Sequence, residues 1–258
     1  MHAETEIDIQ GISGELKENV ELYIGQPVND SERNIAAFAD KLPSEVRDAL
    51  QALGYYNSKI SVERSTLTRK DTTAERITVT VERGPAVKVT NMEIRLKGDV
   101  NTNGDQTFRK MLDDLPLQKG DTLNHGLYEK TKSQLFNTAQ DRGYFDASFV
   151  ETSARVDRQT NSASILLVFD SGRRYKFGEV SFDTDFFNVG FLERWVPFET
   201  GDPYELDLIA KLTQELQSSG YFSRVRVRTL RDQPVDGHIP IEVTLNTTEA
   251  NKVGLGVG

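Results

Sequence analysis

The chain has 258 residues, 37% of them hydrophobic and 28% charged, a composition that is typical of a folded globular protein and excludes an extended disordered tract. Its formal net charge is −9 and it contains no cysteine, so we expect no basic surface for nucleic acid, and disulfides and thiolate metal sites are excluded. The longest apolar run, ILLVF at 165–169, is far shorter than the ~20 residues of a membrane helix, and the opening MHAETEIDIQ has no signal-peptide pattern.

The first third of the chain predicts a strand, a helical region and two more strands. Alternating apolar residues indicate strands, and apolar residues spaced by three or four indicate a helix. The strand positions are Ile7, Ile9 and Ile12, then Ile60 and Val62, then Ile77, Val79 and Val81, and the helix positions are Val46, Leu50 and Leu53. The helix ends at Gly54, and Gly84 follows the last strand.

The same order of elements recurs twice more. In the second copy the strand positions are Val87, Val89, Met92 and Ile94, the helix positions Leu127, Thr131, Leu135 and Ala139, and the last strand is 165–169. In the third copy the helix positions are Leu206, Ile209, Leu212 and Leu216. The three strands of that copy have apolar or β-branched positions at Tyr175, Phe177, Val180 and Phe182, at Val225, Val227 and Thr229, and at Ile239, Ile241, Val243 and Leu245. The apolar positions after Gly84 and after Gly172 have the same offsets of 3, 5, 8 and 10.

A Gly-Tyr-aromatic tripeptide follows the long helix in all three copies. Its residues are Gly54 and Tyr55, Gly143 and Tyr144, and Gly220 and Tyr221, each pair followed by Tyr or Phe. Glycine adopts the left-handed conformation that ends a helix, and the next residue can pack back on the helix. We therefore predict that each tripeptide is a structural joint that stops a helix and begins a strand. The strand register after Gly54 differs by one residue from that after Gly220, which indicates either a different turn or a β-bulge.

These elements predict an α+β protein made of three tandem βααββ repeats, each with a small mixed three-stranded sheet covered by two helices. The predicted first repeat is 1–85, the second repeat is 86–173 and the third repeat is 174–248. No Gly/Ser-rich or Pro-rich linker separates them, so we expect short, stiff junctions and an elongated array.

The βααββ unit with GYF after its long helix, and with Gly120-Asp121 and Gly201-Asp202 before that helix, resembles the polypeptide-transport-associated (POTRA) domain. These domains precede the barrel in the outer-membrane assembly superfamily of BamA and TamA. The segments IDIQGISGELKENV, LQALGYYNSKI and GRRYKFGEVSF are most similar to TamA-type members. The alternation in NKVGLGVG is typical of a membrane β-strand, so we predict that 249–258 begins the first strand of a transmembrane β-barrel.

The resemblance implies the periplasmic portion of a Gram-negative outer-membrane protein that aids insertion or export of autotransporter-type and other outer-membrane proteins. The partners it implies are a TamB-like inner-membrane protein, β-rich outer-membrane client polypeptides and the chain's own C-terminal barrel. It implies no enzyme, cofactor, nucleic acid or small-molecule substrate. A BamA-like or two-partner-secretion transporter is the alternative family placement, and an enzyme or small-ligand binder in an αβ sandwich is the alternative class.

One stretch stands out as a candidate partner-binding edge. In 223–231, Arg224, Arg226 and Arg228 alternate with Val225 and Val227, and the stretch contains no acidic residue. One interpretation is a solvated strand face whose charges discourage aggregation. The other is an edge strand that pairs with an extended partner by β-augmentation, with the arginines attracting acidic segments. Both interpretations require an exposed edge.

Two motifs suggest ligands but fail on their spacing. Residues 99–104 match the first half of a calcium-binding loop, but the twelfth position is Lys110 instead of Glu, so we predict a polar turn before a helix. The three histidines lie far apart in sequence, which disfavours a metal site or a catalytic triad. For Trp195 we predict a place in a hydrophobic core.

Overall fold

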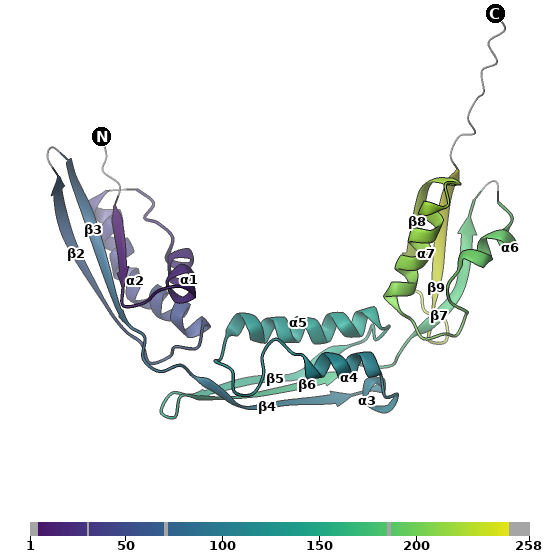
Figure 1. Ribbon diagram of the computed structural model, residues 1–258, viewed down its shortest axis with the longest axis horizontal. Coiled ribbons are helices and arrows are strands. Elements are labelled where there is room, and N and C mark those ends of the chain that lie inside the picture. The colour runs from purple at the N-terminus through teal and green to yellow at the C-terminus, as the bar shows by residue number, and fades with distance from the viewer. Residues whose placement is uncertain (1–4, 30, 70–71, 185–186, 248–258) are drawn as a thin grey trace, which may run out of the picture. The chain divides into compact units, whose positions relative to one another are not determined.

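The computed structural model describes residues 5–29, 31–69, 72–184 and 187–247 (Figure 1). The chain divides into two compact units. Unit one comprises 1–94, 115–133 and 152–167, and unit two comprises 95–114, 134–151 and 168–258. The predicted strand at 249–258 lies outside the described residues.

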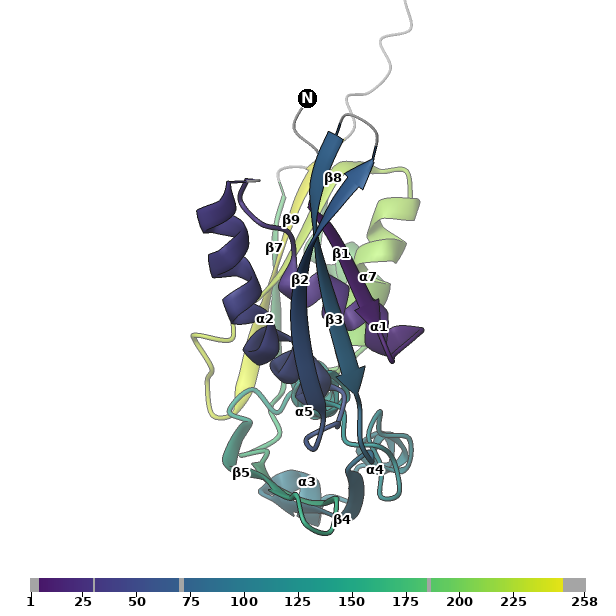
Figure 2. The same ribbon diagram turned by 90° about the vertical axis from the view of Figure 1, so that its left-hand side faces the viewer.

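The first sheet contains β1 (Glu6–Gln10), β2 (Lys59–Arg69) and β3 (Thr72–Glu82). The strand order is β1-β3-β2, with β1 parallel and β2 antiparallel to the central β3. Strands β2 and β3 lie side by side along their whole length (Figures 1 and 2). The short helix α1 (Glu15–Ile24) and the long helix α2 (Glu32–Ala52) lie between β1 and β2 in the chain. The sheet is therefore mixed, as predicted.

Helices α1 and α2 pack against this sheet through the apolar residues of one face of each helix. In α2 the buried residues recur every three or four positions, the spacing of a single helix face; they are Ile35, Ala39, Leu42, Val46, Ala49 and Leu50. They share a core with Val20 and Ile24 of α1 and with Ile77, Val79 and Val81 of β3. Ser31 caps α2 through its hydroxyl, which accepts a hydrogen bond from the Asn34 N–H.

The second sheet has the same strand order, β4-β6-β5. Its strands are β4 (Lys88–Lys97), β5 (Ser148–Asp157) and β6 (Ser162–Asp170). The helices of this repeat are α3 (Asp99–Thr102), α4 (Gln106–Asp113) and α5 (His125–Asp141). The segment that resembles a calcium loop is a one-turn helix followed by Asp105, whose carboxylate caps α4 by accepting hydrogen bonds from the Thr107 and Phe108 N–H groups. Among the described residues, no group of three or more His, Asp or Glu side chains could hold a metal ion.

The third sheet contains β7 (Lys176–Asp183), β8 (Phe222–Thr229) and β9 (His238–Thr247), in the order β7-β9-β8. Strand β7 is parallel and β8 antiparallel to the central β9. Helix α6 (Val189–Leu192), the 3-10 turn η1 (Glu193–Trp195) and helix α7 (Leu206–Ser218) complete the repeat. Trp195 is half-buried and packs against the core of this repeat. Among the described residues, no helix is both long and apolar enough to cross a membrane.

Two register shifts interrupt the third sheet. The register of β8 against β9 shifts between Phe222 and Arg224, and β8 begins two residues after Gly220 whereas β2 begins five residues after Gly54, so a bulge and a shorter turn both accompany the difference noted in the sequence. The register of β7 against β9 shifts between Phe177 and Val180, opposite Pro240. Proline has no N–H to donate to a neighbouring strand, and a bulge at this point removes the need for that hydrogen bond.

Candidate interaction surfaces

The glycine of each predicted joint has a positive φ, with values of 89° at Gly54, 81° at Gly143 and 77° at Gly220. After α2, the Tyr55 N–H donates to the Leu50 carbonyl at 2.9 Å. After α5, the Tyr144 N–H donates to the Ala139 carbonyl at the same distance. Both are the hydrogen bonds that close a Schellman cap, which explains how these glycines end their helices.

Gly54 also contacts the second repeat, within unit one. The Val87 N–H donates to the Gly54 carbonyl and the Leu123 N–H donates to the Val87 carbonyl, both at 2.9 Å. A Cβ at Gly54 would collide with the Leu123 carbonyl oxygen. We call this contact the first joint. Glycine is required here by the close approach as well as by φ.

Gly143 makes the same contact with the third repeat, within unit two, which we call the second joint. The Tyr175 N–H donates to the Gly143 carbonyl at 2.8 Å, and the Tyr204 N–H donates to the Tyr175 carbonyl at 3.0 Å. A Cβ at Gly143 would lie 2.7 Å from the Tyr204 Cβ. Sequence reasoning identified the helix ends but missed that they are also the contacts between successive repeats. The repeated Gly-Asp pairs before the long helices were the available signal.

The loops that contain Leu123 and Tyr204 form backbone hydrogen bonds with the first strands of the second and third repeats. In the second repeat, the Val89 N–H donates to the Asp121 carbonyl at 2.9 Å. In the third repeat, the Phe177 N–H donates to the Asp202 carbonyl at 2.8 Å. The loops therefore pair with the first residues of β4 and β7.

Gly220 differs from the other two glycines because a Cβ there would meet nothing within 4 Å. Tyr221 is 49% exposed, whereas Tyr144 is fully buried. The Tyr221 ring lies among Phe187, Phe191 and Phe222, with centroid distances of 5.8 to 6.3 Å. The sequence predicted that all three tyrosines pack back on their helices, but Tyr221 remains half exposed.

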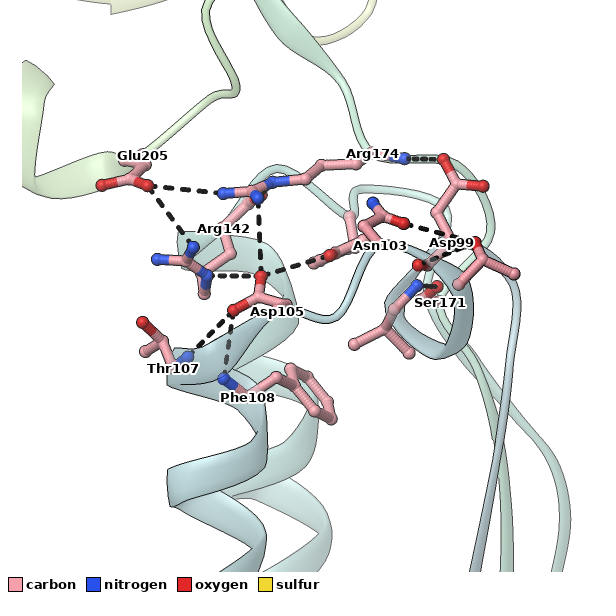
Figure 3. Close-up of polar contacts among 12 residues, drawn as sticks. Asp99, Asn103, Asp105, Thr107, Phe108, Arg142, Ser171, Arg174 and Glu205 are labelled. Carbon is pink, nitrogen blue, oxygen red and sulfur yellow. Dashed lines mark hydrogen bonds and ion pairs between the residues drawn. The ribbon is translucent and has the colours of Figure 1, made fainter.

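A buried ion-pair network lies at the second joint (Figure 3). The Asp105 side chain is fully buried, and its Oδ2 lies 2.6 Å from Arg142 Nε and 3.6 Å from Arg174 Nη1. Glu205 completes the network, with Oε1 3.4 Å from an Nη2 of each arginine. Asp105 and Arg142 belong to the second repeat, whereas Arg174 and Glu205 belong to the third. The network thus connects the two repeats with alternating charges.

The same network sets the ionisation of its members. Burial raises the pKa of Asp105, but the hydrogen bond from Arg142, the Phe108 N–H and the charges of both arginines outweigh it, so the pKa lies below its ordinary value. Burial, together with the Asp105 charge, raises the pKa of Tyr144 to about 12. The Tyr144 hydroxyl donates to Asp105 at 3.2 Å. Asp105 is therefore an anion at neutral pH and Tyr144 is its neutral donor.

Side chains at the first joint form exposed hydrogen bonds and no ion pair that the described residues show. Tyr56 OH lies 2.6 Å from His125 Nε2. The Asn57 amide donates to the Arg158 carbonyl at 2.7 Å and to Asn161 Oδ1 at 2.9 Å. These contacts are exposed, so they are weaker than the buried ion pairs of the second joint.

The strand that follows each Gly-Tyr-aromatic tripeptide lies at a sheet edge. Strands β2, β5 and β8 are each last in the order of their sheets. In the described part of the chain no further strand pairs with the outer side of β8. Arg224, Arg226 and Arg228 are exposed, and Arg228 lies 3.6 Å from Glu242 of β9. The predicted arginine stripe is thus on an edge strand, with one of its cations paired across to the neighbouring strand.

Family models match the chain along most of its length. The model of "POTRA domain TamA domain 1" matches residues 6–83. The POTRA model described as "Surface antigen variable number repeat" matches residues 92–172 and 175–250. The chain therefore belongs to the POTRA domain family, the class that its βααββ repeats define.

The individual relatives have low sequence identity to this chain. The chain is similar to the outer membrane protein assembly factor BamA of Neisseria meningitidis serogroup B, at 23% identity over 60% of this chain and 21% of that protein. It thus spans about a fifth of that relative's length. Among solved structures, it is similar to the POTRA3-5 fragment of Haemophilus influenzae BamA, at 18% identity and a TM-score of 0.47, covering 95% of this chain and 96% of that one. It is also similar to CdiB from Acinetobacter baumannii, at 13% identity and a TM-score of 0.39, covering 64% and 31%.

Proposed function

We propose that this chain is the periplasmic POTRA region of a Gram-negative outer-membrane protein that assembles or secretes other proteins. Its role is that of a binding scaffold, because the features that stand out in it are strand edges and joints between repeats. The BamA relative is an outer membrane protein assembly factor, which supports this class of function. Strands β2, β5 and β8 are the proposed binding elements.

The observation that carries this proposal is that an edge strand follows each of the three Gly-Tyr-aromatic tripeptides. An edge strand presents backbone N–H and C=O groups that can pair with any extended polypeptide. Such pairing depends little on the side chains of the client, which suits a scaffold that handles many unfolded outer-membrane proteins. The client then adds a strand beside β2, β5 or β8.

The arginine stripe of β8 adds electrostatic attraction to this pairing. Arg224 and Arg226 are exposed on an edge strand of a chain whose net charge is −9. A local cluster of cations attracts acidic segments and raises the rate of encounter. Changing Arg224, Arg226 and Arg228 to Glu should lower client binding at least several-fold. The melting temperature should fall slightly, because Arg228→Glu places a carboxylate directly opposite Glu242.

A matched control separates this local effect from the change in net charge. Arg47, Lys130 and Lys211 are exposed on helices, so changing these three to Glu alters the net charge equally on another surface. If both triple variants bind a purified unfolded client equally well, the arginine stripe has no role in binding and only the solvated-face interpretation of these residues remains.

A photo-crosslinking scan of the full-length protein in cells tests the edges directly. Positions along 59–69, 148–157 and 222–229 should crosslink to client polypeptides. Exposed helix positions such as Arg47, Asn137 and Gln214 serve as controls. Crosslinks that are as frequent at the helix positions as along the three strands would overturn the edge mechanism.

We further propose a TamA-type protein that acts with a TamB-like inner-membrane partner on autotransporter-type clients. The match of residues 6–83 to the first domain of TamA supports this placement, whereas the BamA relative supports the alternative. Purified chain should retain a TamB C-terminal fragment in a pull-down and should not retain BAM lipoproteins. The opposite result would favour a BamA-like protein, and retention of neither would favour a two-partner-secretion transporter.

A further inference from the structure

A short loop before the long helix occurs once in every repeat. Its sequences are Gly-Gln-Pro-Val at 25–28, Gly-Asp-Thr-Leu at 120–123 and Gly-Asp-Pro-Tyr at 201–204. We call these segments the glycine loops. Each begins with glycine and has an apolar residue in fourth place. The three loops are thus equivalent positions of one repeated fold.

In two of the three glycine loops, the fourth residue is buried against the preceding repeat. Leu123, fourth in the second loop, is 1% exposed, and Tyr204, fourth in the third loop, is fully buried. Both lie against the glycine that ends the long helix of the preceding repeat, Gly54 and Gly143 respectively. In both joints the occupant is a helix end that closes with glycine followed by an aromatic residue.

The equivalent loop of the first repeat is open. Val28 is 93% exposed, in contrast to its counterparts Leu123 and Tyr204. Six residues earlier, Leu22 of α1 is 85% exposed, and the adjacent Tyr23 is 54% exposed. Val28 and Leu22 are the two most exposed of the large apolar side chains in the described residues. Exposed apolar residues gathered in one short segment mark an interaction site.

We propose that the first glycine loop, together with Leu22, binds the helix end of a further POTRA-type domain. The occupant must present glycine, because both occupied loops approach that residue too closely for a Cβ. The aromatic residue after the glycine supplies apolar area, as Tyr55 and Tyr144 do within this chain. This partner site is separate from the strand edges and does not depend on them.

The surrounding charge specifies the partner further. Glu18 and Glu21 of α1 are exposed close to the loop in sequence, and Glu21 lies 3.9 Å from Lys17. The C-terminal end of a helix carries a partial negative charge, so these carboxylates would repel an uncharged helix end. The partner should therefore carry Lys or Arg in or directly after its last turn, as the second joint does with Arg142, which follows α5 and immediately precedes Gly143.

A photo-crosslinking experiment on the full-length protein in its own cells tests this site. Benzoylphenylalanine is placed at position 28 and at position 22. Position 235 serves as a control, because Val235 of the third repeat is an exposed apolar residue too, with 63% of its surface exposed. Positions 28 and 22 should crosslink to a defined protein. Mass spectrometry should locate the crosslink at a Gly-aromatic dipeptide that directly follows a helix. That helix should carry Lys or Arg in or directly after its last turn.

A substitution makes the test quantitative. Val28→Asp should lower the crosslinking yield from position 22 by roughly tenfold, because the aspartate would be desolvated in the complex, whereas Val235→Asp should leave it unchanged. The melting temperature of both variants should match that of the parent, since both side chains are exposed.

Two results would overturn the proposal. One is a crosslink from position 28 that maps to a strand, or to a helix end without glycine and an aromatic residue. The other is a yield at positions 28 and 22 that is no higher than at position 235. Neither result would affect the edge-strand mechanism, which the scan of β2, β5 and β8 tests separately.

Discussion

The two joints have the same backbone geometry but different side-chain chemistry. In both, a residue that begins the next repeat donates its N–H to the glycine carbonyl, Val87 to Gly54 and Tyr175 to Gly143. The first joint adds exposed hydrogen bonds. The second adds a buried network of two arginines and two carboxylates. Backbone hydrogen bonds therefore set the connection between repeats, and side chains set how strongly each connection resists disruption.

The largest expected effect comes from Asp105. Asp105→Ala removes the fully buried carboxylate between Arg142 and Arg174 and leaves two partly buried cations without it. Breaking a buried ion pair in this way costs about 3–5 kcal/mol in the free energy of unfolding. Urea unfolding measures the loss, and Asp113→Ala, at an exposed position of the same helix, should cost less than about 0.5 kcal/mol. Equal losses for the two variants would show that the network does not stabilise the second joint.

The next effect compares two glycines of the same motif. Gly143→Ala and Gly220→Ala both place a Cβ on a residue with positive φ, which costs about 1–2 kcal/mol in each case. Only Gly143→Ala also collides with Tyr204, which adds about 1–3 kcal/mol. Thermal unfolding of the two variants tests this difference. If Gly220→Ala destabilises the chain as much as Gly143→Ala, the contact between repeats is not what requires glycine at the second joint.

Acid should weaken the second joint through Asp105. Because its pKa in the folded chain is below its ordinary value, ionised Asp105 stabilises the fold above about pH 4, the ordinary range of an aspartate. That stabilisation is lost as the pH falls through the lowered pKa. Hydrogen exchange at 99–108 and 171–175 should therefore accelerate as the pH is lowered below about 4, after correction for intrinsic rates. Asp105→Asn should remove this component, and an unchanged acid dependence in that variant would assign it to other carboxylates.

The smallest effect is expected at the first joint. Tyr56→Phe removes the exposed hydrogen bond to His125 but keeps the ring beneath Arg158, whose guanidinium lies 5.7 Å from the ring centroid. The free energy of unfolding should fall by only about 0.5–1 kcal/mol. Urea unfolding beside Asp105→Ala gives the comparison directly. A larger loss for Tyr56→Phe than for Asp105→Ala would reverse the ranking of the two joints.

The periodic segments made most of the fold predictable. The three-residue and four-residue spacing in 206–216 predicted α7, and the alternation in 239–245 predicted β9, because both patterns follow from the local geometry of helices and strands. The mixed three-stranded sheets were predicted correctly as well. The β8 bulge was one of two alternatives, because the shift in apolar spacing alone does not distinguish a bulge from a different turn.

The candidate site was less predictable than the fold. Asp105 directly follows the segment that resembles a calcium loop, and nothing in the sequence distinguishes it from the neighbouring Asp99. Its importance arises from Arg142 and Arg174, which lie 37 and 69 positions away. A weak signal existed, since Arg142 precedes the joint glycine and Glu205 follows Tyr204 only at the second joint.

Sequence by itself determined which elements this protein has, where its long helices stop and which three strands follow the Gly-Tyr-aromatic tripeptides. These features depend on contacts within a few residues, so the local order of side chains is sufficient to specify them. Only the tertiary structure decided that Gly54 and Gly143 are covered while Gly220 is not, and that Val28 is exposed while Leu123 and Tyr204 are buried. The physical reason is that burial depends on which distant segment packs against a residue, and equivalent residues of the three repeats have different neighbours.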